Sequence, residues 1–83
     1  MLTVSVISPE RILFEGEADA VVAPAFDGEV GVMTDHAPML TLVGSGELRL
    51  NVRGATTRFT VQGGFMQVVD NTVRVVTESA TPL

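Results

Sequence analysis

Apolar and polar residues alternate along most of this chain with a period of two. In residues 2–7 the valines fall on one face, and threonine and serine fall on the other. Such alternation is typical of a β-strand with one buried face. Ser8-Pro9-Glu10 predicts a turn, and residues 11–23 predict a second extended segment with a bulge or bend at Gly16. The amino-terminal quarter of the chain is therefore predicted to be two strands.

A first hairpin is predicted in residues 47–62. With Gly54-Ala55 as a two-residue loop, glycine at the first loop position suits a type II′ turn. The facing pairs are then Leu48 with Val61, Leu50 with Phe59 and Val52 with Thr57. The opposite face carries Glu47, Arg49, Asn51 and Arg53, with Arg58 opposite Asn51, and is interpreted as a solvated or protein-docking face.

A second hairpin is predicted in residues 65–77 around Asp70-Asn71. Both turn residues tolerate the positive φ that a type I′ turn requires. The pairs are Met66 with Val75 and Val68 with Val73, and Phe65 with Val76 on the opposite face. Gly63-Gly64 predicts a sharp turn before this hairpin. Residues 39–43 predict a short apolar strand, and residues 78–83 predict a polar tail that frays.

These segments predict one all-β domain over residues 1–83. At least seven short strands with regular turns, and no segment with a 3.6-residue period, favour an antiparallel β-sandwich or barrel.

The stretch 26–42 separates the predicted strands and contains the only histidine. Gly28 and Gly31 bracket Glu29, so the backbone could take positive φ on both sides and present that acid at a loop tip. Pro38 favours an extended residue before it, which places His36 on an extended or turn segment. A polar loop between strands is where function is expected.

Composition excludes several kinds of partner. The net charge is −5, and all five cations are arginine. This argues against nucleic acid and against adsorption to anionic lipid. No apolar run approaches the roughly 20 residues that span a bilayer, and no secretory signal is evident. Without lysine, the chain has no phosphate-binding P-loop.

Reactive residues are few. A zinc site needs three or four ligands from Cys, His, Asp or Glu, and the chain has no cysteine and a single histidine. We therefore expect no metal and no cofactor. Two hypotheses remain from the residues: a non-catalytic protein-docking domain, and a small ligand-binding or hydrolytic sandwich that uses His36 with Asp35 or Glu29. The scarcity of reactive residues favours the first.

Several motifs carry a resemblance to a known family. They are the runs at 4–10, Phe14-Glu15-Gly16, Asp27–Val32, Asp35–Leu40 and Gly63-Gly64-Phe65. In this order and spacing the chain resembles the N-terminal β domain of the epsilon subunit of the F-type ATP synthase, which is called delta in mitochondria. The resemblance covers essentially the whole chain. The usual C-terminal α-helical hairpin has no counterpart in this sequence.

The resemblance implies a flattened sandwich of two five-stranded sheets. It also implies a non-catalytic central-stalk subunit that binds the gamma shaft and the membrane c-ring and couples ion flow to ATP synthesis. Such a subunit has no catalytic residue and no small-molecule substrate, and it lies peripherally at the cytoplasmic face of the plasma membrane or its organelle equivalent. The implied ring-facing residues are Glu29, Gly31, His36 and Pro38, and Ser8 is implied to lie near gamma.

Overall fold

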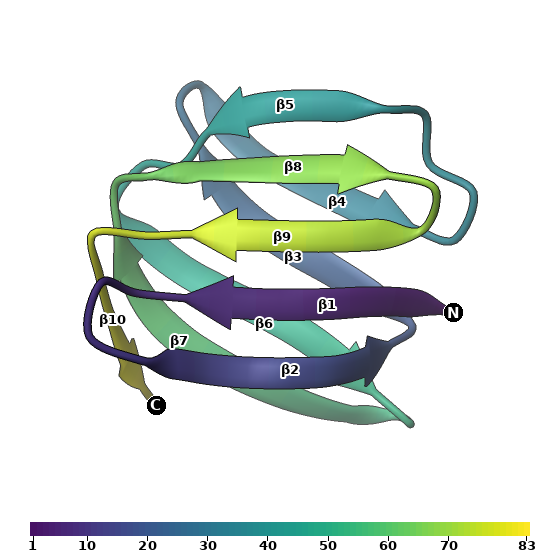
Figure 1. Cartoon of the computed structure of the whole chain (residues 1–83), viewed down its shortest axis with the longest axis horizontal. Helices are drawn as coiled ribbons and strands as arrows, with labels where there is room; N and C mark the ends of the chain where they lie inside the picture. The colour runs from purple at the N-terminus through teal and green to yellow at the C-terminus, as the bar shows by residue number, and fades with distance from the viewer.

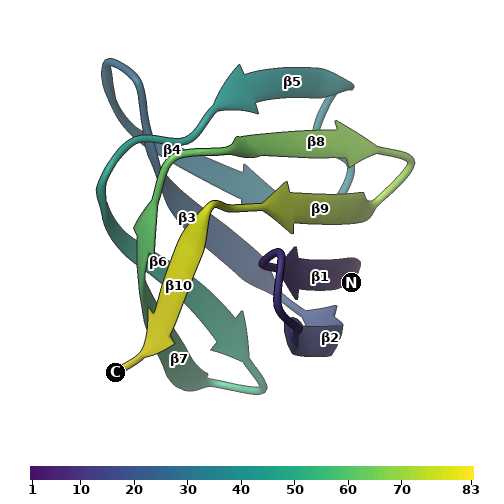
Figure 2. The ribbon, with the colours of Figure 1, turned by 60° about the vertical axis from the view of Figure 1, so that its left-hand side comes forward.

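The fold is a sandwich of two five-stranded β-sheets, as predicted (Figure 1). The computed structural model describes residues 1–83 and contains strands, turns and bends but no helix. The second view shows the two sheets as separate layers facing each other (Figure 2). No helix long and apolar enough to cross a membrane is present.

The first sheet has the strand order β2-β1-β9-β8-β5. Its pairs are antiparallel except for β1 and β9, which run parallel. In sheet order, its strands are β2 (Ile12–Ala18), β1 (Leu2–Ile7), β9 (Thr72–Val76), β8 (Phe65–Val69) and β5 (Met39–Leu42).

The second sheet has the order β10-β7-β6-β3-β4 and is antiparallel throughout. In Figure 1 it lies behind the first sheet, with its strands crossing diagonally. In sheet order, its strands are β10 (Ser79–Pro82), β7 (Ala55–Gln62), β6 (Gly46–Val52), β3 (Ala20–Ala25) and β4 (Gly28–Met33).

The core lies between the sheets and is built from the inward side chains of both. Because strand side chains alternate between faces, each strand contributes every second residue. Sixteen hydrophobic side chains form one buried cluster, nine of them valine: Leu2, Val4, Val6, Ala18, Val21, Ala23, Val32, Val43, Leu48, Leu50, Phe59, Val61, Met66, Val68, Val73 and Val75. β-Branched side chains suit such a pleated, buried surface.

The hairpin predicted around Asp70-Asn71 is confirmed. Both residues have positive φ, 49° and 60°, as a type I′ turn needs. Val68 lies opposite Val73, and Phe65 lies opposite Val76. The sharp turn at Gly63-Gly64 is also confirmed, with φ values of 65° and 102°.

The predicted register of the β6–β7 hairpin is wrong. Leu48 lies opposite Phe59, and Arg58 lies opposite Arg49, so the loop is Arg53-Gly54. Both loop residues have positive φ, which makes a type I′ turn, and the Gly54 amide donates to the Asn51 side chain at 3.1 Å. The observed pairing is shifted by two residues along one strand relative to the predicted pairing. Because side chains alternate with a period of two, every side chain keeps its predicted face.

Two further expectations are wrong. Gly16 lies in an unbroken part of β2 opposite Val4, and the extended segment divides at Asp19 instead, where the chain passes to the other sheet. The predicted fraying tail is strand β10, paired with β7. The buried Thr77 hydroxyl lies within 3.0 Å of the carbonyls of Gln62 and Ser79 at this passage.

Candidate partner-docking surfaces

Glu29 lies on strand β4 and not at a loop tip. It is paired with Pro24 of β3, and Gly31 is a regular residue of the same strand without positive φ. The tip is formed by the two residues before β4, Phe26 and Asp27, with the Phe26 side chain 83% exposed. Only Gly28 needs positive φ here, at 134°.

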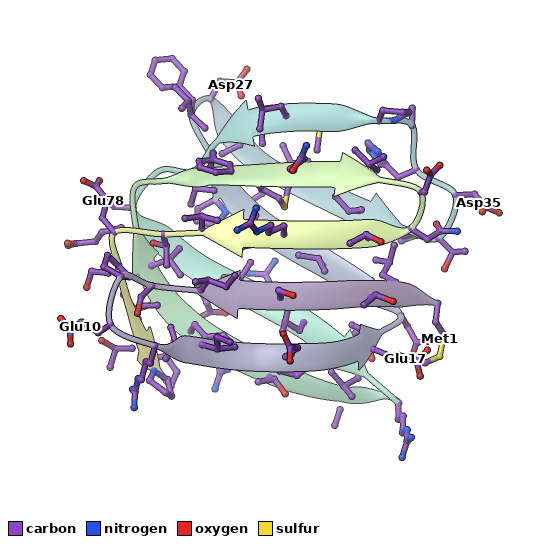
Figure 3. The ribbon with its side chains drawn as sticks, viewed as in Figure 1. Met1, Glu10, Glu17, Asp27, Asp35 and Glu78 are labelled. Carbon is purple, nitrogen blue, oxygen red and sulfur yellow. The ribbon has the colours of Figure 1, made fainter.

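Glu29 and His36 lie at opposite ends of β4, so the expectation of a single loop end is wrong. A six-residue strand spans about 20 Å, and Glu29 is near its start while His36 follows its end. Figure 3 shows the two ends, with Asp27 on one side of the molecule and Asp35 on the other. Gly31 is mid-strand, and Pro38 belongs to the His36 end.

At the Glu29 end, the carboxylate is held by Arg49 of β6. The two Arg49 terminal nitrogens lie 3.1 and 3.3 Å from the two Glu29 oxygens, which is a bidentate pair across the outer face of the second sheet. The hydrogen bond to Glu29, with its charge, raises the pKa of Arg49. Glu47 extends the network, at 3.6 Å from Arg49 and 3.9 Å from Arg58.

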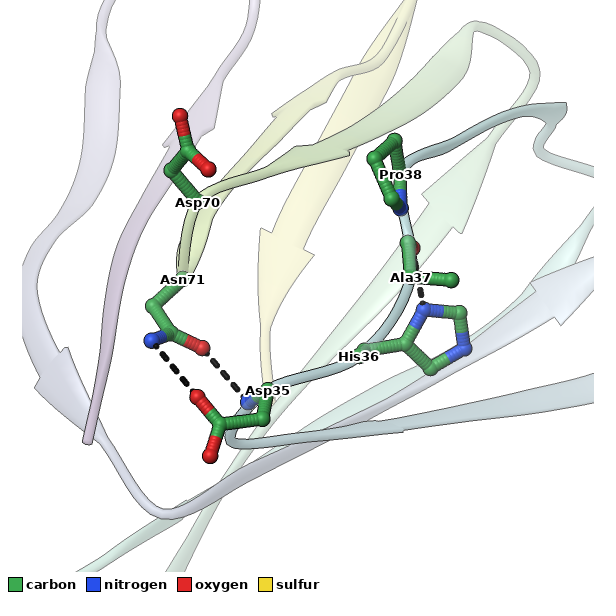
Figure 4. Close-up of a pocket in the computed structure, with 6 residues that line it drawn as sticks. All are labelled: Asp35, His36, Ala37, Pro38, Asp70 and Asn71. Carbon is green, nitrogen blue, oxygen red and sulfur yellow. Dashed lines mark hydrogen bonds between the residues drawn. The ribbon is translucent and has the colours of Figure 1, made fainter.

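At the other end, the β4–β5 loop is tied to the β8–β9 turn (Figure 4). The Asp35 amide donates to the Asn71 side-chain oxygen at 2.6 Å, and the Asn71 amide group donates to the Asp35 carboxylate at 3.2 Å. Asp35 has a positive φ of 67°. The two segments border a pocket of about 290 Å³ that Asp35, His36, Ala37, Pro38, Asp70 and Asn71 line.

His36 has no acid partner in this arrangement. Its Nδ1–H donates to the Ala37 carbonyl at 2.7 Å, and its main-chain amide donates to the Met33 carbonyl at 3.2 Å. Asp35 is bonded to Asn71, and Glu29 is bonded to Arg49 at the other end of the strand. The His36–carboxylate pair that a hydrolytic sandwich would use is therefore not assembled. No group of three metal-ligating side chains is present either.

Replacing Asn71 by glycine tests this tie between the loop and the turn. Glycine keeps the positive φ of the turn but removes both hydrogen bonds to Asp35. We expect a loss of about 1 kcal/mol in the free energy of unfolding, since exposed hydrogen bonds each contribute little, and faster hydrogen exchange at the His36 amide. Asp70→Gly is the control, because it alters the same turn without touching the loop. Equal exchange at His36 in both variants would contradict the role of Asn71.

Ser8 lies in the turn between β1 and β2. Its amide and its hydroxyl both donate to the Arg11 carbonyl, at 2.9 and 3.2 Å. These bonds explain serine at this position as a turn residue. In Figure 1 this turn lies on the same side of the molecule as the β3–β4 turn.

An apolar patch on the outer face of the first sheet was not identified from the sequence. It consists of Leu40 and Leu42 on β5 and Phe65 and Val69 on β8, with exposed fractions of 68%, 64%, 36% and 41%. These side chains share a face because Leu42 lies opposite Phe65, while Met66 and Val68 point into the core. The exposed Gln67, opposite Leu40, lies on the same face between Phe65 and Val69. A hollow of about 360 Å³ opens between Leu40, Thr41, Leu42 and Phe65. The sequence does indicate this patch: apolar residues occupy both odd and even positions in 39–43 and in 65–69, so each predicted strand has apolar side chains on its outer face as well as on its inner face.

The model of the ATP synthase delta/epsilon chain β-sandwich domain matches residues 1–83. This chain belongs to that family. The resemblance inferred from the motifs is thereby confirmed.

Curated relatives of this family support the assignment. The chain is 46% identical over 78 residues to the ATP synthase epsilon chain of Rhodopirellula baltica, and 43% identical over 77 residues to that of Leptospira borgpetersenii. These matches cover 94% and 93% of this chain but 61% of each relative. The chain therefore spans about three-fifths of the length of these relatives.

Solved structures share the fold. A chain of the Euglena gracilis mitochondrial ATP synthase OSCP/F1/c-ring assembly superposes with a TM-score of 0.91 at 23% identity, over 98% of this chain and 52% of that one. A chain of the Tetrahymena thermophila mitochondrial ATP synthase central stalk and c-ring gives 0.82 at 16% identity, over 96% and 65%. At these identities the likeness establishes the two-sheet fold.

Proposed function

We propose that this chain is the β-sandwich domain of a non-catalytic central-stalk subunit of a rotary F-type ATP synthase. Its curated relatives are named ATP synthase epsilon chains, and its structural neighbours come from assemblies that contain the central stalk and the c-ring. In such an assembly the domain does not itself catalyse a reaction. It turns with the shaft and helps to transmit rotation between the ring and the catalytic head.

The observation that carries the proposal is the exposed apolar patch on β5 and β8. Contiguous exposed apolar side chains on a small soluble domain mark protein-interaction sites. The patch lies on paired strands and not on a loop: Met66 and Val68 of β8 are buried in the core, and the partly buried Met39 of β5 packs against it. A rigid face of this kind suits a partner that must transmit torque. We assign the patch to the shaft subunit, gamma.

The ring contact is assigned to the end of the domain that carries the β3–β4 turn. This end presents the exposed Phe26 beside Asp27, and the Glu29–Arg49 pair follows at once on the outer face. The acids can bind cationic side chains on the polar loops of a membrane ring, while Phe26 supplies apolar contact. His36 and Pro38 follow the other end of β4, about one strand length away, and their place in the ring contact stays a prediction. The subunit would then sit peripherally on the membrane-bound complex, at its cytoplasmic face.

The proposal is tested by adding this chain to ATP synthase particles from which the epsilon chain has been removed. We expect the chain to bind the particles and to co-sediment with gamma at micromolar concentration. A hydrolytic sandwich would instead act alone on a small substrate, and its assembled His–carboxylate pair is not present here. Failure to bind either the stripped particles or isolated gamma would contradict the proposal.

A charge swap tests the ring contact separately. Glu29→Arg alone would place two guanidinium groups together, so a loss of coupling could arise within the domain. The double variant Glu29→Arg with Arg49→Glu restores the internal pair but reverses the charge nearest the turn. We expect this double variant to fold normally and still to lower the number of ions pumped per ATP hydrolysed, most strongly at low salt. Normal coupling in the double variant would show that Glu29 acts only within the sheet.

A further inference from the structure

The four strands at the sheet edges differ in how they are protected against pairing with another chain. Edge strands expose unpaired main-chain N–H and C=O groups, and proteins usually block them with charges, proline or irregularity. The β2 edge contains Glu15-Gly16-Glu17, the β4 edge contains Glu29 and Gly31, and the β10 edge ends at Pro82. The β5 edge is Met-Leu-Thr-Leu, with no charge, glycine or proline within it.

The hydrogen-bond direction along β5 identifies which groups are free. The amide of Val43, directly after β5, donates to the Gly64 carbonyl at 3.0 Å, which continues the register of β5 on β8. Main-chain direction alternates along a strand, so Met39 and Thr41 also point toward β8. It follows that the N–H and C=O groups of Leu40 and the N–H of Leu42 point to the open edge. The Leu42 carbonyl accepts from the Thr41 hydroxyl at 3.5 Å, and the open edge ends there because the next residue, Val43, bridges to Ala25 of β3. In both ribbon views β5 is the last strand of its sheet, with no strand beyond it (Figures 1 and 2).

The same two leucines belong to the apolar patch. The hollow of about 360 Å³ beside them borders the edge as well as the face, because Thr41, on the other side of the strand, also lines it. The open edge and the apolar face are therefore continuous. A strand added at this edge would pair with the main chain of Leu40 and Leu42 and place alternate side chains over the hollow.

We propose that β5 accepts an extended segment of the shaft subunit as a sixth strand of the first sheet. This inference rests on the proposed function and names how the shaft is bound. The segment has apolar side chains at alternate positions and carries no acidic residue, because the domain has a net charge of −5. The same charge disfavours a second copy of this chain as the occupant, since two copies repel each other.

Hydrogen exchange on the wild-type domain, alone and bound to isolated gamma, tests the proposal. We expect the Leu40 and Leu42 amides to exchange freely in the isolated domain and at least about tenfold more slowly in the complex, because they become hydrogen-bonded. Met39 and Thr41 should be protected in both states. If the complex forms while Leu40 and Leu42 keep their free exchange rates, the added strand is refuted and the face alone binds. If no complex forms, the proposed function fails together with this inference.

A matched pair of variants gives a second readout. Leu40→Pro removes the outward N–H, which the domain itself does not use, and Leu40→Ala removes a similar amount of side chain but keeps the N–H. We expect the proline variant to bind gamma about tenfold more weakly than the alanine variant, for one lost hydrogen bond. Equal affinities would overturn the proposal, and so would protection of Leu40 that rises with concentration in the domain alone, which would indicate self-pairing. If the proline variant does not fold, the exchange result on the wild-type domain decides.

Discussion

Replacing Gly64 by alanine is expected to unfold this domain or to bring it close to unfolding. A Cβ at this position would lie 1.9 Å from the Val76 carbonyl oxygen and 2.7 Å from the Thr77 Cα, and φ is +102°. Both obstructing atoms are main chain, in the segment that leads from β9 to β10, so they cannot move away by a rotamer change. We expect a loss of about 4 kcal/mol or more. A domain of this size has only about 4–12 kcal/mol of stability in total.

Gly54→Ala is the matched control for this prediction. Gly54 also has a positive φ, +82°, but an added Cβ would meet nothing within 4 Å. Only backbone strain then opposes the substitution, and we expect a loss of about 1–2 kcal/mol. Urea unfolding followed by circular dichroism measures both variants. Similar midpoints for the two would show that the close approach of Gly64 to Val76 does not constrain the fold.

Introducing two acids into the apolar patch is expected to abolish binding to the shaft subunit. In the double variant Leu40→Glu with Leu42→Glu, two carboxylates would have to be buried without partners on association, which is strongly unfavourable. We expect the affinity for isolated gamma to fall by a factor of about 100 or more. The fold should persist, because the two leucine residues are 68% and 64% exposed in the isolated domain. Titration calorimetry gives the affinity and thermal melting gives the stability.

Thr56→Glu is the control for the patch variant. Thr56 is exposed on β7 of the other sheet, so it adds an acid to the same domain on the opposite outer face. We expect its affinity for gamma to stay within about twofold of wild type, because screening limits the effect of a distant charge. An equal loss in both variants would mean that net charge, and not the patch, governs binding. An unchanged affinity in the patch variant would move the shaft contact away from β5 and β8.

Local features of the chain were sufficient to predict much of the fold. The period-two pattern specifies which side chains of residues 2–7 and 65–76 face the core, because strand side chains alternate strictly. The Asp70-Asn71 turn fixed its own register, since both residues tolerate the positive φ of a type I′ turn. At Arg53-Gly54 the same reasoning failed, because arginine gives no signal for positive φ. In the structure, Arg53 and Gly54 both have positive φ, and the Gly54 amide donates a hydrogen bond to the Asn51 side chain.

The docking surfaces depended on the tertiary structure. Glu29 and Arg49 are 20 residues apart in the chain, and only the order β6-β3-β4 brings them together. Residues of β5 and β8 form one patch for the same reason. Periodicity determines whether a side chain faces in or out, but it does not give the neighbouring strand or the end of the sandwich where a loop lies. Those depend on long-range pairing of the sheets. The separation of Glu29 and His36, seven positions apart, has a local cause instead: residues 28–33 form the extended strand β4 and not the predicted loop, so the two residues lie at opposite ends of that strand.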